Sequence, residues 1–260
     1  MIKIGVLGGS GRMGRLIVQK ILESPKARLS AVGIHHQKPI GLDLPDILMT
    51  TDPEEVFSHS DIVIDFTKPE ALQDHIEAAL RSTKPVVIGT TGLTDAHQIL
   101  IKEAGHHIPI LWAPNMSLGL TVMLKLTEKI ASILDSSFDI EILEMHHRHK
   151  TDAPSGTALA LGKAAAKGRN IPFHENACFN RMECHTSRSK DQIGFAVLRG
   201  GNVSGDHQVF FASDEEIITL SHRALDRDIF AKGALKAALW LLGKSPRLYT
   251  MQDVADLPWR

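Results

Sequence analysis

The sequence predicts an α/β protein with an N-terminal domain built on a parallel sheet and a second domain of mixed α+β structure. Up to about residue 112, short β-branched apolar runs alternate with segments of helical periodicity, which is typical of βαβ units. From about residue 138 the order changes to a strand, a helix and then three strand-like runs. The 260 residues are enough for one or two domains with a sizeable core.

The elements of the first part follow one another in a regular order. A helix is expected at 13–24, another at 69–81 and a third beginning near Asp52, and the Thr67 hydroxyl with Glu70 is expected to cap the second of these. The apolar runs predict buried strands at residues 2–7, 29–34, 62–65, 85–88 and 108–112.

The second part begins with a long helix, and the change of pattern places the domain boundary near residues 115–118. A strand is expected from Phe138 and a helix after Pro154. The last helix has a broad apolar face, but the sequence does not fix the domain on which it packs. The remaining expected elements are the long helix at 118–134, strands near 192–199, 207–213 and 215–221, and the last helix at 227–242.

The composition argues against several classes of protein. With 29 Lys+Arg against 30 Asp+Glu, the chain has no overall field that would attract nucleic acid or an anionic membrane. It has no long apolar run and no N-terminal apolar leader, so we expect a cytoplasmic protein that binds neither nucleic acid nor membrane. Cys178 and Cys184 lack the CxxC spacing of redox and zinc motifs, and we expect them to be reduced.

A glycine-rich turn lies between the first strand and the first helix. Gly8 permits a tight turn, Gly11 lets backbone amides approach a pyrophosphate, and Gly14 allows the helix to pack closely on the strand. Arg12 suits a phosphate or ribose contact. The pattern predicts a dinucleotide site, and the alternative is a plain βα turn.

The coenzyme is predicted from the end of the second strand. NAD-preferring folds usually place an acid there for the ribose 2′-hydroxyl, but this chain has His35, His36 and Lys38 nearby and no carboxylate. These residues favour NADPH with NADH tolerated, unless they are only solvated loop residues. Two further polar turns, at 89–92 and 113–117, follow strand ends and suit a nicotinamide pocket, with helix-capping loops as the alternative.

A basic run at 144–158 precedes another expected helix start. Ser155 is a candidate N-cap, and Gly156 at the first helical position leaves room for an anion held by Lys150, Thr157 and backbone amides. His146 is our candidate proton donor, with Lys150 as a second acid or charge stabiliser.

Other interpretations of the same run are a histidine metal site, a solvated basic edge, or docking of phosphate or nucleic acid. Arg148 and Lys150 would repel a metal cation, so we expect no metal. No aromatic residues interleave with the charges, which argues against nucleic acid.

Together these motifs resemble the 4-hydroxy-tetrahydrodipicolinate reductase (dihydrodipicolinate reductase) family over nearly the whole chain. The resemblance rests on GGSGRMG at 8–14, DFTKPE at 65–70, GTTG at 89–92, APNMSLG at 113–119 and EMHHRHKTDAPSGTA at 144–158. It implies a Rossmann-like domain at 1–117 with 227–260 returning to it, and a substrate-binding and oligomerisation domain at 118–226 of a homotetramer. It also implies reduction of a cyclic dicarboxylate by NADPH or NADH with loss of water, in diaminopimelate and lysine biosynthesis.

The resemblance further implies a role for individual residues. His146 matches the proton donor, Lys150 the lysine beside it, His147 a substrate contact, and Gly156 and Thr157 the carboxylate cradle. The implied cofactor-binding residues are Gly8, Gly9, Ser10, Gly11, Arg12, Met13, Gly89, Thr90, Thr91, Ala113, Pro114, Asn115 and Met116, with His35 as a candidate beside them.

The chain departs from the family pattern at two places. Ile34 stands where members that use NADH readily often have an acid, and the loop at 181–188 lacks the family's usual glycines. Two other functions were weighed: a different two-domain oxidoreductase, such as an amino-acid or sugar dehydrogenase, and a regulatory module that binds NADPH without turnover. The run at 144–158 argues against both.

Overall fold

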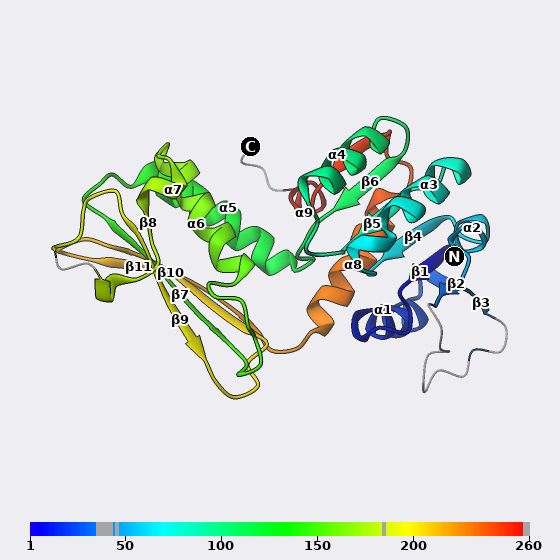
Figure 1. The fold of residues 1–260 in the computed structure, drawn as a ribbon, viewed down its shortest axis with the longest axis horizontal. Helices are drawn as coiled ribbons and strands as arrows, with labels where there is room; N and C mark the ends of the chain where they lie inside the picture. Colours follow the sequence, from blue (N-terminus) through cyan, green and yellow to red (C-terminus); the bar gives the residue numbers. More distant parts are fainter. Residues whose placement is uncertain (35–43, 45–46, 184–185, 257–260) are drawn as a thin grey trace. The chain divides into compact units, whose positions relative to one another are not determined.

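The computed structural model describes residues 1–34, 44, 47–183 and 186–256, which fold into two compact units (Figure 1). The first unit comprises Met1–Leu118 and Asp228–Arg260, and the second comprises Gly119–Arg227.

A seven-stranded sheet forms the first unit, in the order β12-β6-β5-β4-β1-β2-β3 with every neighbouring pair parallel. The predicted parallel sheet is therefore confirmed. Its strands are β1 (Ile2–Leu7), β2 (Ala27–Gly33), β3 (Leu48–Thr50), β4 (Ile62–Asp65), β5 (Val86–Ile88), β6 (Pro109–Trp112) and β12 (Arg247–Tyr249). Its helices are α1 (Arg12–Leu22), α2 (Pro53–Ser58), α3 (Leu72–Ser82) after the short 3-10 turn η1 (Pro69–Ala71), α4 (Asp95–Ala104), α8 (Asp228–Leu241) and α9 (Met251–Ala255).

Helices cover this sheet on both faces. One buried cluster joins the sheet to α1 and α8, through residues such as Ile17 and Ala234, and the other joins it to α2, α3 and α4, through residues such as Phe57 and Ile76. Strands buried on both faces must be apolar almost throughout, which explains the short continuous apolar runs in the sequence. The last long helix, α8, thus packs on the first unit, a point that its sequence alone left open.

The register of the sheet brings four strand ends to one edge. Leu7 pairs with Asp65, Asp65 with Ile88, and Ile88 with Trp112. β1 lies between β2 and β4, so the chain reverses the direction in which the sheet grows at this point. Open α/β sheets bind ligands at such a switch point, outside the carboxyl ends of the strands.

The second unit has a five-stranded mixed sheet in the order β11-β10-β7-β9-β8. β7 is parallel to β9 and antiparallel to β10, so the predicted α+β character is confirmed. The elements are α5 (Leu118–Ile133), β7 (Asp139–His146), α6 (Gly156–Arg169), α7 (Phe173–Asn176), β8 (Ala177–Cys178), the 3-10 turn η2 (Arg181–Glu183), β9 (Ile193–Arg199), β10 (Gly205–Ala212) and β11 (Ile217–Ala224).

One face of this second sheet packs on helices. β7 alternates strictly between half-buried and buried residues, and its buried residues Ile140 and Ile142 join a core with Leu161 and Ala165 of α6. The same alternation directs Glu144 and His146 to the buried face. No helix within the described ranges combines the length and the apolar character that a membrane span requires.

Some local expectations differ from the structure. The expected cap at Thr67 is wrong: its hydroxyl donates to Asp65 Oδ1 at 2.6 Å, and the turn before α3 has Lys68 at its N-cap without a side-chain bond. A buried carboxylate two residues away is the stronger acceptor, so it takes the hydroxyl. Asp52 and Ser155, in contrast, cap α2 and α6 as expected.

Candidate active site

The turn after β1 is shaped by its glycines. Gly8 has a positive φ of 81°, which glycine adopts without strain, and a Cβ on Gly14 would overlap the Gly8 carbonyl group. The amides of Gly8 and Gly9 donate to the Gly33 carbonyl oxygen at 3.1 and 3.0 Å, which fixes the turn on β2. Gly11 is the N-cap of α1 and has no side chain to bond the first amides of the helix. The helix N-terminus is therefore suited to an anionic group.

The other two predicted loops follow β5 and β6 at the same edge of the sheet. Thr90 is 2% exposed, and its Oγ1 has no hydrogen-bond partner among the described residues. Asn115 Oδ1 accepts from the Ser117 amide at 2.9 Å, which orders the second loop. Met116 is 1% exposed and belongs to the core, so only its backbone is available to a ligand. Because a buried polar atom normally has a partner, the Thr90 hydroxyl is available to a polar group from outside the chain.

A carboxylate at the end of β4 supports these loops. Asp65 Oδ2 is 2.8 Å from His75 Nδ1, and its Oδ1 accepts from the Thr67 amide at 2.9 Å. These bonds hold Phe66, against which both Gly8 and Gly89 pack so closely that a Cβ on either would overlap it. The DFT sequence at 65–67 therefore shapes the edge where the glycine turn and the 89–92 loop meet. His35, His36 and Lys38 lie outside the described residues.

In the second unit, His146 ends β7 on the buried face and is 8% exposed. Its Nδ1 lies 2.5 Å from Glu144 Oε2, which also accepts from Arg199 NH1 at 2.9 Å. Glu144 Oε1 accepts from Arg199 NH2 at 2.9 Å and from the Ser155 amide at 3.0 Å. One carboxylate thus connects the histidine, an arginine of β9 and the N-cap of α6.

The surroundings set the charge of these groups. Burial by itself would raise the pKa of Glu144, but the hydrogen bonds from Arg199, His146 and the Ser155 amide outweigh it and lower that pKa. Burial lowers the pKa of His146, and the positive charges of Lys150 and Arg199 add to the decrease, against the Glu144 hydrogen bond that raises it. Without ligand, Glu144 is ionised and His146 is largely neutral near pH 7.

His207 of β10 completes the cluster, although the sequence did not single it out. It stands opposite Glu144 in the β7–β10 register, and its ring lies 5.0 Å from the His146 ring in a T-shaped arrangement. Its Nε2 is 3.2 Å from Ser155 Oγ, which also caps α6 by accepting from the Ala158 amide. Burial lowers the pKa of His207 to about 4, so this ring is neutral at pH 7.

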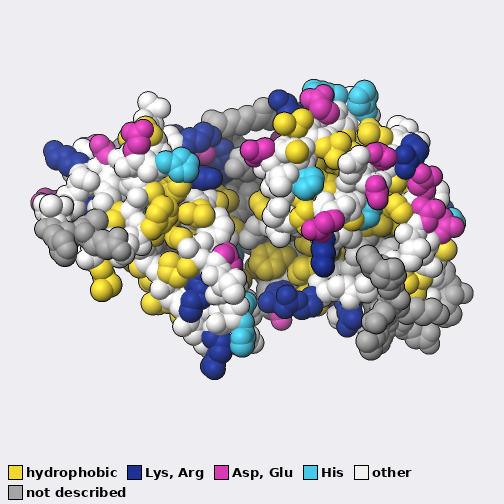
Figure 2. All heavy atoms as spheres, viewed as in Figure 1, with side chains coloured by type: hydrophobic (Ala, Val, Ile, Leu, Met, Phe, Trp, Pro, Cys, Tyr) yellow, Lys and Arg dark blue, Asp and Glu magenta, His cyan; other side chains and the backbone are white. Residues whose placement is uncertain are grey.

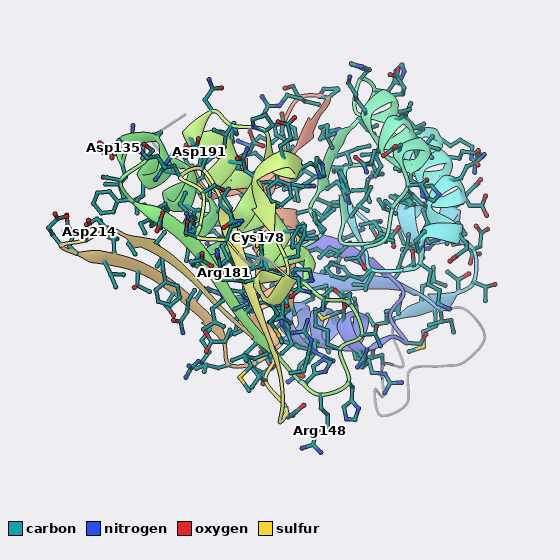
Figure 3. All side chains as sticks on the ribbon, turned by 60° about the vertical axis from the view of Figure 1, so that its left-hand side comes forward. Asp135, Arg148, Cys178, Arg181, Asp191 and Asp214 are labelled. Atoms are coloured by element: carbon teal, nitrogen blue, oxygen red, sulfur yellow. The ribbon has the colours of Figure 1, made fainter. Side chains whose placement is uncertain are left out.

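The remaining predicted residues surround the N-terminus of α6 and the preceding loop. Lys150 Nζ is 2.8 Å from Asp152 Oδ1, so this cation is already paired in the ligand-free chain. His147 Nδ1 is buried and has no partner among the described residues. A Cβ on Gly156 would meet nothing within 4 Å, and Thr157 is half-buried beside it. Arg148 is exposed at the tip of the loop after β7 (Figure 3).

The three histidines of the basic run do not share one site. His146 faces the buried side, whereas the rings of His147 and His149 lie 6.2 Å apart on the loop beyond the strand. Glu144, His146 and His207 do present atoms within 4.8 Å of one another, a spacing that a cation could use. Both Glu144 oxygens, however, already accept from Arg199, and a guanidinium at this position opposes a second cation. Hydrogen bonding therefore accounts for the cluster.

Comparison with known proteins identifies the family. The model "Dihydrodipicolinate reductase, N-terminus" matches residues 2–116, and "Dihydrodipicolinate reductase, C-terminus" matches residues 119–255. The chain is 48% identical over 256 residues to the 4-hydroxy-tetrahydrodipicolinate reductase of Zymomonas mobilis, with 98% of each chain covered. It is 44% identical to the enzyme of the same name from Sulfurimonas denitrificans, covering 99% of this chain and 100% of that one.

Solved structures agree. Dipicolinate-bound dihydrodipicolinate reductase from Paenisporosarcina sp. TG-14 has a TM-score of 0.76 and 26% identity, with 96% of this chain and 97% of that chain covered. GenD2 from gentamicin A biosynthesis, solved with NAD, has a TM-score of 0.62 at 13% identity, covering 98% of this chain and 90% of that one, and shares the fold alone. The resemblance inferred from the motifs is confirmed, and the chain belongs to the dihydrodipicolinate reductase family.

Proposed function

We propose that this chain carries out its family's reaction with His146 as the proton donor: NAD(P)H-dependent reduction of 4-hydroxy-tetrahydrodipicolinate, with loss of water, in diaminopimelate and lysine biosynthesis. The observation that carries the assignment of the donor is the buried Glu144–His146 pair linked to the N-terminus of α6. The reaction consumes one hydride and one proton and releases one water for each tetrahydrodipicolinate formed.

The substrate is a dicarboxylate, and the second unit offers it an anion site. The open space at Gly156 and the free end of α6 suit one carboxylate, with the Thr157 hydroxyl as a further donor. Lys150 supplies positive charge, and His147 has an unpartnered buried ring nitrogen for a second contact. The dipicolinate bound to the Paenisporosarcina relative is a flat diacid, which supports a ligand of this class. We therefore expect pyridine-2,6-dicarboxylate to inhibit competitively.

A nicotinamide cofactor fits the first unit. The amides of Gly8, Gly9 and Gly11 donate to backbone carbonyl groups, so the cofactor's pyrophosphate would be held by the amides at the start of α1, which the close packing of Gly14 on Gly8 keeps near the turn. The unpartnered Thr90 hydroxyl and the loop at 113–116 suit a carboxamide. When bound, the reduced nicotinamide supplies the hydride, while the protein orients the ligands and provides charge and a proton.

The proposal also covers the coenzyme preference, the roles of the two units and the oligomeric state. NADPH is preferred over NADH, since no acid follows Gly33 to repel a 2′-phosphate. The first unit is the dinucleotide-binding domain, and the second binds substrate and forms a homotetramer. The tetramer is supported by apolar side chains on the sheet face of the second unit that faces away from the helices. A cytoplasmic location stays a prediction.

The test is turnover of enzymatically generated 4-hydroxy-tetrahydrodipicolinate, followed as the loss of absorbance of NADPH or NADH. We expect turnover with both coenzymes and a higher kcat/KM with NADPH. Binding of NADPH without turnover of this substrate would contradict the proposed reaction and favour a regulatory module. A higher kcat/KM with NADH would contradict the coenzyme preference alone.

A further inference from the structure

Glu144 is the most heavily bonded side chain of the cluster. Its carboxylate is 1% exposed and accepts four hydrogen bonds, from His146 Nδ1, the Ser155 amide and both terminal nitrogens of Arg199. The arginine bond is bidentate, which is the strongest and most directional way to fix a carboxylate. Arg199 NH2 also donates to the Asp152 carbonyl oxygen at 2.7 Å, so the arginine itself is anchored to the loop before α6.

We infer that Glu144, held by Arg199, is a positioning residue that fixes the His146 ring. Because of Glu144, His146 takes up a proton at Nε2 when the substrate binds. The inference rests on the proposed function, because it assumes that the dicarboxylate binds beside His146. It assigns to Glu144 and Arg199 roles that lie one step away from the reacting atoms.

The bond to Glu144 fixes the orientation of the His146 ring. Because the ionised Glu144 can only accept, His146 Nδ1 must carry a hydrogen in both protonation states of the ring. Nε2 is then the nitrogen that gains and loses the proton. Within the part of the chain that the structure describes, Nε2 has no hydrogen-bond partner, and a Cβ added to Gly205 would lie 3.2 Å from it. The exchanging nitrogen is thus available to a ligand.

The second consideration is the charge around the His146 ring. The charged and titratable groups facing the ring are Glu144 on β7, Arg199 on β9, His207 on β10 and Lys150 on the following loop. His207 is neutral at pH 7, so two cations and one anion act on His146 besides its burial. A bound dicarboxylate adds negative charge, which reverses this balance and favours the imidazolium form. Without Glu144, Arg199 would lose its carboxylate partner, and the same ligand would have to offset that added positive charge before the imidazolium form is favoured.

The direct test is isothermal titration calorimetry of pyridine-2,6-dicarboxylate binding to the NADPH-loaded protein, in buffers of different ionisation enthalpy. The dependence of the binding enthalpy on the buffer gives the number of protons taken up. For the unaltered chain we expect a measurable fraction of a proton near pH 7.5, and a clearly smaller fraction for Glu144→Gln. The matched control is Glu141→Gln, the same change on the opposite face of β7, which should leave the uptake unchanged.

Kinetics gives a second measurement that a merely structural role would not affect. An acid must be protonated, so kcat falls as the pH rises through the pKa of His146 in the complex. Removing the Glu144 charge lowers that pKa, so the alkaline limb of the profile should move to lower pH. At pH 7.5 we expect kcat to fall at least about tenfold, which is less than the ~10²–10⁴-fold that a general acid typically contributes, because His146 itself is still present.

The outcomes separate this inference from the proposed function. If the unaltered chain does not turn over the substrate, the proposed function fails. If it does, but Glu144→Gln keeps both the proton uptake and the position of the alkaline limb, only the present inference is overturned. Should Glu144→Gln fail to fold, Glu144→Asp keeps the charge but withdraws it from the ring, and the same shifts should appear to a smaller degree.

Discussion

Two basic residues four positions apart have very different surroundings. His146 is buried at the end of a strand and held by Glu144, whereas Lys150 pairs with Asp152, whose side chain is 59% exposed. An ion pair of this kind contributes only about 0–1 kcal/mol, because water and salt screen it. In the proposed reaction, Lys150 would exchange Asp152 for a substrate carboxylate at little cost, whereas the His146 ring is held in place by its buried carboxylate.

This difference predicts that substitutions of His146 and Lys150 affect different kinetic parameters. His146→Gln should lower kcat by about 10²–10⁴-fold, because the acid is lost. Its affinity for NADPH should stay nearly unchanged, since the glycine turn lies in the other unit. Lys150→Ala should mainly raise KM for the substrate. Steady-state kinetics and NADPH binding titrations check both. An undiminished kcat in the first variant would remove His146 from the mechanism, and an unchanged KM in the second would remove Lys150 from the anion site.

The residues of this cluster were predictable to different degrees. His146 and Lys150 lie in one short run, so their residue types and the following helix start were enough to single them out. Arg199 and His207 join the same cluster only through the registers of β9 and β10 with β7. Strand pairing between distant segments is decided by tertiary packing, and no local pattern reveals it. The alternation along the strand at 139–146 was the one available hint, since it directs Glu144 to the buried face.

At the scale of elements, α1 depends on the glycine turn for its position. A side chain at Gly14 would overlap backbone atoms of Gly8 and Gly9, which cannot move aside as the end of a side chain can. The helix would have to shift away from β1, and the turn that it carries would shift with it. The close packing of α1 on β1 and the shape of the glycine turn therefore depend on each other.

We accordingly predict that Gly14→Ala destabilises the chain by about 1–3 kcal/mol, as overpacking typically does. It should also weaken NADPH binding. Thermal unfolding measures the first effect, and a fluorescence titration of NADPH measures the second. Gln19→Ala places the same side chain on the exposed side of α1 and should change neither. Unaltered stability and unaltered NADPH affinity in Gly14→Ala would contradict the packing argument.

Long periodic elements were predicted well, whereas some short ones were missed. The helices at 118–133 and 228–241 lie within one residue of their expected ends, and the helix at 156–169 begins after Ser155 as expected. α4 was missed although Thr94 caps it, because the reciprocal bond comes from His97 and not from the usual glutamate. β12 has only three residues and exists through its pairing with β6. Its place in the sheet depends on that contact and not on its sequence.

At the scale of the whole molecule, one face of the sheet in the second unit packs on no helix of the described residues. Residues that alternate with the buried ones on β9, β10 and β11 point away from α5 and α6. Leu198 is 48% exposed and Ile217 is 64% exposed on this face, and Figure 2 shows hydrophobic side chains (yellow) on the surface of this unit. The same face carries polar residues such as Asp206 and Arg223, and exposed apolar side chains rimmed by polar ones are typical of a surface that packs against another copy of the chain.

The proposed homotetramer makes this face an interface, which gives the last prediction. Leu198→Glu should break the association, because each interface would bury a carboxylate without a partner at a cost of several kcal/mol. Light scattering after size exclusion should give four times the monomer mass for the unaltered chain and a lower mass for the variant. Leu22→Glu is the matched control, since Leu22 is 51% exposed on α1 in the first unit and the mass should not change. A tetramer that persists in Leu198→Glu would place the contact elsewhere, and a monomeric unaltered chain would remove the interface altogether.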